Sequence, residues 1–136
     1  GSLYFDQYKS YQDKDLVYIT PYIKRMDLAY AASDFIISRS GASSVSELCI
    51  IGKPVIFIPS PNVSEDHQTT NARTIANKKA AIIIEEKSLS NDFEKCFSEL
   101  LNSKTLQITL TNNIKKLAKP LATEKIINEV ITLLKG

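Results

Sequence analysis

Residues 35–48 read FIISRSGASSVSEL, and this stretch decides the fold of the chain. Residues 35–37 form a short apolar run of the kind that becomes a buried strand, and Leu48 begins a second apolar segment. The small residues between them predict a turn that leads directly into a helix. Such a turn exposes backbone N–H groups at the helix N-terminus, where the helix dipole favours an anion.

Glu47 is the charged residue of this predicted helix start, and two interpretations of it are open. As a binding residue, its carboxylate would accept hydrogen bonds from two vicinal hydroxyls, which suits the ribose of a nucleotide diphosphate. As a structural residue, it would complete a capping box with Ser44, three residues earlier. The spacing of the two residues is compatible with both interpretations.

The composition is that of one ordinary soluble domain with a real core, because 43% of the 136 residues are hydrophobic and 24% are charged. The net charge of +2 argues against a nucleic-acid partner. Cys49 and Cys96 are expected to be reduced thiols. His67 is the single histidine and has no cysteine near it, so we expect no metal and no cofactor. No apolar run is long enough for a membrane span, and no leader is visible.

Four short apolar runs predict a parallel sheet, at residues 16–19, 35–37, 55–58 and 81–84. They are continuous rather than alternating, which is typical of strands that are covered on both faces. Helical segments are predicted between them, at residues 27–33, 44–51 and 67–78, so the repeated unit is strand then helix. Because ligands of open α/β sheets bind outside the carboxyl ends of the strands, the loops after these strands should converge on one site.

Residues 59–72, PSPNVSEDHQTTNA, are the second segment with binding chemistry. Asp66 is the predicted N-cap of a helix, and Gln68 and Asn71 share a helical face with His67 beside them. Amide side chains both donate and accept hydrogen bonds, which suits sugar hydroxyls. The alternative is a capped surface helix with a polar first turn. For His67 we favour a binding or helix-start role over that of a general base.

The glycines are few, and they fall at Gly1, Gly41, Gly52 and Gly136. A complete nucleotide-binding α/β domain begins with a strand and a glycine-rich loop, and no such loop is present. We therefore expect a single partial domain over residues 1–136 whose amino-terminal units are missing. Its α/β core would span about 16–84, and a helical segment would span about 91–135.

Five segments, taken in order, resemble the carboxy-terminal domain of the MurG family of peptidoglycan GlcNAc transferases. They lie at residues 21–26, 29–34, 38–48, 52–59 and 67–72. The resemblance implies an α/β fold with a Rossmann-like parallel sheet flanked by helices, as in the donor domain of a two-domain glycosyltransferase. Mild departures are Lys24 and Arg25, where relatives often carry acidic residues, and Ser43 and Ser44 in place of a Leu-Thr pair.

The resemblance also implies which residues bind the nucleotide. Glu47 would bind the ribose hydroxyls, and residues 42–44 would bring donors to the diphosphate and ribose. Ile23 would lie against the uracil and Tyr22 beside the diphosphate. The implied nucleotide-binding residues are therefore Tyr22, Ile23, Ala42, Ser43, Ser44 and Glu47, and the resemblance adds Met26 as a further substrate-binding residue.

The implied sugar-binding residues come from the second segment. Gln68 and Asn71, with His67, would hold the hydroxyls of GlcNAc, and Arg39 would support the loop near them. No catalytic residue is expected in this chain, because the family's presumed base lies in the amino-terminal domain. The chain would therefore be about the last third of an enzyme, and inactive alone.

The activity implied by the resemblance is metal-independent transfer of GlcNAc from UDP-GlcNAc to lipid I, which forms lipid II. Lipid I would be held through the missing amino-terminal domain. The whole protein would sit in the bacterial cytoplasm, at the cytoplasmic face of the inner membrane. Two alternatives are another enzyme of this architecture, such as a UDP-GlcNAc epimerase, and a nucleotide-sugar-binding subunit completed by a partner.

Overall fold

The computed structural model describes residues 2–13, 16–61 and 66–135. The chain divides into two compact units, residues 1–33 and 34–136. The first unit holds α1 (Ser2–Tyr8), the 3₁₀ helix η1 (Lys9–Asp13) and α2 (Met26–Ala32). α2 confirms the helix predicted at 27–33.

The strand predicted at residues 16–19 is wrong. These residues carry no strand, and Leu16 is fully exposed with a φ of 69°. A strand is stabilised by a hydrogen-bonded neighbour and by burial of its side chains. Among the described residues this segment pairs with no strand, and three of its four side chains are exposed. The segment has the apolar composition of a strand, but no described strand pairs with it.

The second unit is built on a parallel sheet. β1 (Ile36–Ser38), β2 (Val55–Phe57) and β3 (Ile82–Ile83) lie in the order β1-β2-β3. Ile36 pairs with Val55, and Ile56 pairs with Ile82. These strands confirm three of the predicted runs and the parallel sheet itself.

Helices connect and flank the strands. α3 (Ala42–Ile51) follows β1, and α4 (His67–Ala76) follows β2. After β3 come the 3₁₀ helix η3 (Glu86–Ser88), then α5 (Leu89–Asn102), α6 (Lys104–Lys115) and α7 (Ala122–Lys135). The helical carboxy-terminal segment is thus confirmed. No helix in the described part of the chain is both long and apolar enough to cross a membrane.

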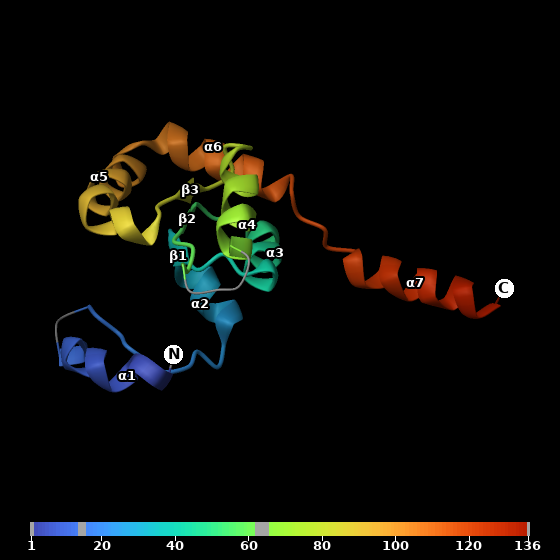
Figure 1. Ribbon diagram of the computed structural model, residues 1–136, viewed down its shortest axis with the longest axis horizontal. Coiled ribbons are helices and arrows are strands. Elements are labelled where there is room, and N and C mark those ends of the chain that lie inside the picture. Colours follow the sequence, from blue (N-terminus) through green and yellow to red (C-terminus); the bar gives the residue numbers. More distant parts are fainter. Residues whose placement is uncertain (1, 14–15, 62–65, 136) are drawn as a thin grey trace. The chain divides into compact units, whose positions relative to one another are not determined.

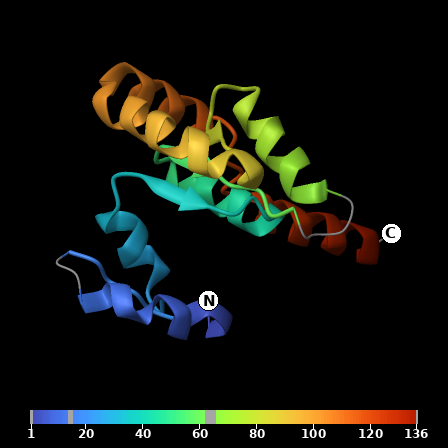
Figure 2. The same cartoon turned by 60° about the vertical axis from the view of Figure 1, so that its left-hand side comes forward.

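The core lies around the central strand, because all three residues of β2 are fully buried. Ile56 packs in a cluster with Ile84, Leu100 of α5 and Leu110 of α6. The two-residue period of a strand turns Val55 and Phe57 to the other face, and α3 and α4 bury apolar residues of their own. Figure 1 shows the strands between α5 on one side and α3 with α4 on the other, and Figure 2 shows α5 and α6 side by side.

Candidate functional site at the carboxyl edge of the sheet

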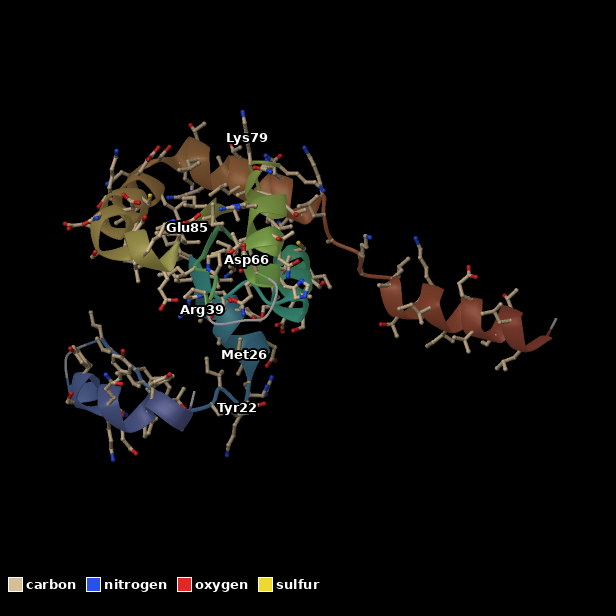
Figure 3. The ribbon with its side chains drawn as sticks, viewed as in Figure 1. Tyr22, Met26, Arg39, Asp66, Lys79 and Glu85 are labelled. Atoms are coloured by element: carbon tan, nitrogen blue, oxygen red, sulfur yellow. The ribbon has the colours of Figure 1, made fainter. Side chains whose placement is uncertain are left out.

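The loops that follow β1, β2 and β3 meet at one edge, as the sequence predicts for these three strands. Arg39, Ser40 and Gly41 follow β1, Ile58 to Ser60 follow β2, and Glu85 and Glu86 follow β3. Figure 3 labels Arg39, Asp66 and Glu85, which come from three different connections of this edge. Side-chain hydrogen bonds join these loops to the first turns of α4.

Ser40 is the centre of this arrangement and is fully buried. Its Oγ donates to the backbone oxygen of Gln68 at 2.8 Å, and its backbone oxygen accepts from Asn71 Nδ2 at 3.1 Å. A buried hydroxyl without a partner would cost free energy, so both bonds hold the start of α4 against the end of β1. Ser40 could not be picked out from the sequence, where it is one small polar residue directly after a buried strand.

Gln68 also reaches the loop after β2. Its Oε1 accepts a hydrogen bond from the backbone N–H of Ser60 at 3.0 Å. In the described part of the chain, each predicted sugar-binding amide thus uses one polar atom for the fold, Oε1 for Gln68 and Nδ2 for Asn71. The structure brings Gln68 and Asn71 together on α4, as predicted, and His67 opens the same helix with an exposed side chain.

The start of α3 tests the capping-box interpretation of Glu47, whereas the ribose-binding interpretation stays a prediction. The helix begins at Ala42 with Gly41 as its N-cap, so Ser44 lies inside the first turn. A capping box needs its serine at the N-cap, and the capping-box interpretation is therefore wrong. The N–H groups of residues 42–44 lie in the first turn, where an α-helix supplies no acceptor for them. Glu47 is exposed on the same helix, just over one turn from Ala42.

Gly41 has an ordinary backbone conformation, with φ −59° and ψ 149°. A Cβ added there would meet only Ser44 Oγ, at 3.9 Å. Neither the backbone nor the packing of the described chain therefore requires glycine at this position. The absence of a side chain at Gly41 would let a ligand approach the backbone closely.

Asp66 is the N-cap of α4, as predicted, but its side chain makes no capping hydrogen bond. It has a φ of 52°, in the left-handed region that asparagine and aspartate tolerate better than most residues. The start of α4 is held instead by the hydrogen bonds of Ser40, Gln68 and Asn71.

Arg39 joins all three strand ends. Its Nη1 donates to the backbone oxygens of Ile58 and Pro59, at 3.1 and 3.2 Å, and pairs with Glu86 Oε2 at 2.6 Å. Arg39 thus contacts the loop after β2 through these two backbone oxygens. Glu86 was missed by sequence reasoning, because it lies 47 positions away and no local pattern links the two residues.

A cavity of about 730 Å³ lies beside this edge. Its lining is charged and proline side chains with one threonine, and none of the predicted substrate-binding residues, all of which the structure describes, lines it. Lys87 and Arg73 both pair with Glu85 there, at 2.7 and 2.9 Å, and they hold the pKa of Glu85 below its usual range. The lining residues are Pro59, Pro61, Asp66, Thr69, Arg73, Glu85, Glu86 and Lys87.

Tyr22, Ile23 and Met26 belong to the first unit, where all three side chains are exposed. Thr20 Oγ1 donates to the backbone oxygen of Tyr22 at 2.8 Å, and Arg25 pairs with Asp27 at the start of α2. Their contribution to a site shared with the second unit stays a prediction. Among the described residues, no group of three or more histidine, cysteine, aspartate or glutamate side chains is placed to hold a metal ion.

The chain is thus an open α/β domain with a helix N-terminus and amide side chains at the carboxyl edge of its sheet, where domains of this class bind their ligands. Residues 2–127 match the model of the glycosyltransferase family 28 C-terminal domain. The chain belongs to this family.

Curated relatives and a solved structure agree with this assignment. The chain is 57% identical, over its full length, to a protein of Flavobacterium psychrophilum named UDP-N-acetylglucosamine–N-acetylmuramyl-(pentapeptide) pyrophosphoryl-undecaprenol N-acetylglucosamine transferase. A protein of the same name from Christiangramia forsetii is 53% identical over 98% of the chain. These matches span 37% and 36% of the two relatives. The crystal structure of Acinetobacter baumannii MurG aligns with a TM-score of 0.83 at 26% identity, over 97% of this chain and 39% of that chain.

Proposed function

We propose that this chain is the donor-binding part of a GlcNAc transferase of peptidoglycan synthesis, which moves GlcNAc from UDP-GlcNAc to lipid I. The observation that carries the proposal is the carboxyl edge of the sheet. There the N-terminus of α3 follows a loop that contains Ser40. Ser40 is hydrogen-bonded to Gln68 and Asn71, which carry the two amides of α4. The acceptor, the catalytic base and contact with the inner membrane are assigned to parts of the protein beyond this chain.

The nucleotide end of the site would use the α3 N-terminus. Free N–H groups of residues 42–44 and the helix dipole suit the two phosphates of UDP, and Gly41 leaves room for them to approach. Glu47 would then accept hydrogen bonds from the ribose hydroxyls. Donors fixed in advance at this position would also stabilise the charge that develops on the diphosphate as UDP leaves.

The sugar end would use the amide groups of Gln68 and Asn71, each held in one orientation by its hydrogen bond to the fold. Because Gln68 Oε1 is taken by Ser60, the side chain offers its Nε2 as a donor. Because Asn71 Nδ2 is taken by Ser40, that side chain offers its Oδ1 as an acceptor. One donor beside one acceptor suits a sugar whose hydroxyl groups can do either, and it penalises an epimer that misplaces a hydroxyl.

The proposal is tested by Glu47→Gln in the intact protein that contains this chain. The amide keeps the shape of the side chain but loses charge-assisted hydrogen bonds to the ribose, each worth about 1.5–3 kcal/mol. We expect the affinity for UDP-GlcNAc, measured by calorimetry, to fall at least about tenfold.

The matched control is Glu94→Gln, since Glu94 is an exposed carboxylate on α5. It should leave the affinity for UDP-GlcNAc unchanged. An unaltered affinity of the Glu47→Gln variant would contradict the ribose-binding role, and absence of UDP-GlcNAc binding by the wild-type protein would contradict the proposed function as a whole.

A further inference from the structure

We propose that Glu86 is a positioning residue for the sugar end of the site, acting through Arg39 and the loop after β2. This inference rests on the proposed function and deepens it. It starts from Glu86, which follows β3, whereas Gln68 lies on the helix that follows β2.

The first step is the ion pair. Glu86 Oε2 lies 2.6 Å from Arg39 Nη1, and both side chains are about half-exposed. Glu86 is the first residue of η3 and lies three residues after Ile83, the last residue of β3. Arg39 follows β1, on the opposite edge strand of the sheet. The pair therefore spans the carboxyl edge from β3 to β1, across the end of β2.

The second step is the orientation of the arginine. The same Nη1 donates to the backbone oxygens of Ile58 and Pro59. The guanidinium group therefore lies against the first residues after β2. An arginine side chain has many rotamers, and an ion pair with a carboxylate reduces those it samples. Glu86 thus holds Arg39 where it can bind these two carbonyl groups.

The third step is the sugar-reading amide. Ser60 is the residue directly after Pro59, and its N–H donates to Gln68 Oε1 at 3.0 Å. The position of this peptide sets which end of the Gln68 amide faces the fold and which end faces a ligand. A series of direct contacts thus runs from Glu86 through Arg39 and the 58–60 loop to Gln68.

This geometry gives Glu86 an effect on the sugar but not on the nucleotide. The hydrogen bonds of Arg39 and Gln68 lead to the loop after β2, whereas the nucleotide end is placed at the first turn of α3. Because exposed ion pairs contribute little, the effect should be small but selective. Glu86→Ala should raise the Kd for UDP-GlcNAc roughly two- to fivefold and leave the Kd for UDP within experimental error.

The experiment measures both dissociation constants by calorimetry on the intact protein, together with its melting temperature. Glu86→Gln keeps an oxygen that can accept from Arg39, so it should recover most of the affinity for UDP-GlcNAc. Glu85→Ala is the matched control, because it removes a neighbouring carboxylate that pairs with Arg73 and Lys87 instead. It should leave both dissociation constants unchanged.

A double variant sharpens the test. In a Gln68→Ala background the route from Glu86 to the sugar is gone, so adding Glu86→Ala should cause no further loss of UDP-GlcNAc affinity. The inference is overturned if the affinity for UDP-GlcNAc does not change, if the affinities for UDP and UDP-GlcNAc fall together, or if Glu85→Ala has the same effect. If the wild-type protein binds UDP-GlcNAc and only these variants disagree, the positioning role fails while the proposed function stands.

Discussion

Single residues at the carboxyl edge serve the fold and the proposed ligand with different atoms. Ser40 is fully committed to the fold, whereas Gln68 and Asn71 divide their polar atoms between loop and surface. The sequence predicted the two amides, because their spacing places them on one helical face. It did not predict Ser40, since nothing local distinguishes a serine that holds a helix from one that faces solvent.

Gly41 gives a prediction at this scale. Its backbone conformation and its surroundings accept a methyl group, so Gly41→Ala should change the free energy of unfolding by no more than about 0.5 kcal/mol. A diphosphate that approaches the α3 N-terminus would meet this methyl group. We therefore expect the affinity for UDP, measured by calorimetry, to drop about tenfold or more. Unchanged affinity would place the phosphates elsewhere.

At the scale of elements, continuous β-branched runs predicted the strands at 35–37, 55–58 and 81–84, because burial on both faces leaves a strong compositional signal. The same signal failed at residues 16–19. The composition of a segment indicates whether its side chains can be buried, whereas strand pairing also needs a neighbouring strand, which the local sequence does not identify. The contact between Arg39 and Glu86 was unpredictable for the same reason, since it depends on the order of strands in the sheet.

The end of α3 gives a prediction for an element. Gly52 caps this helix in the left-handed region, with a φ of 67°, and its N–H donates to the Leu48 carbonyl. A Cβ there would also overlap the side chain of Lys115 on α6. Gly52→Ala should destabilise the protein by about 1–3 kcal/mol, as measured by urea denaturation.

Gly41→Ala is the natural control for this measurement, because it makes the same chemical change at a glycine with negative φ. Equal losses of stability for both variants would show that the left-handed cap of α3 is unimportant.

At the scale of the whole molecule, the chain contains two compact units and spans little more than a third of the relatives it matches. The proposed donor site has groups that bind the donor, and no group in the described chain is assigned as the catalytic base. We therefore expect this chain to bind the donor, and only the intact protein to transfer the sugar.

We predict that this chain, incubated with UDP-GlcNAc and a lipid I analogue, forms no product above the blank in a radiochemical assay, whereas the intact protein does. The reason is that attack on the anomeric carbon needs a base, which we place outside this chain. Turnover by the chain alone would show that the base lies within it, and His67 would then be the first residue to replace.

The parallel order of the strands has a consequence for how quickly the second unit folds. Ile36 meets Val55 and Ile56 meets Ile82, so every strand pairing encloses a complete helix. No hairpin in this sheet can form locally and serve as a nucleus. Because closing such loops costs entropy before the pairing contributes, α3 and α4 should form ahead of the sheet, and the strands should come together late. During that interval the most apolar segments of the unit are exposed, which makes the folding chain, rather than the folded one, the form most prone to aggregate.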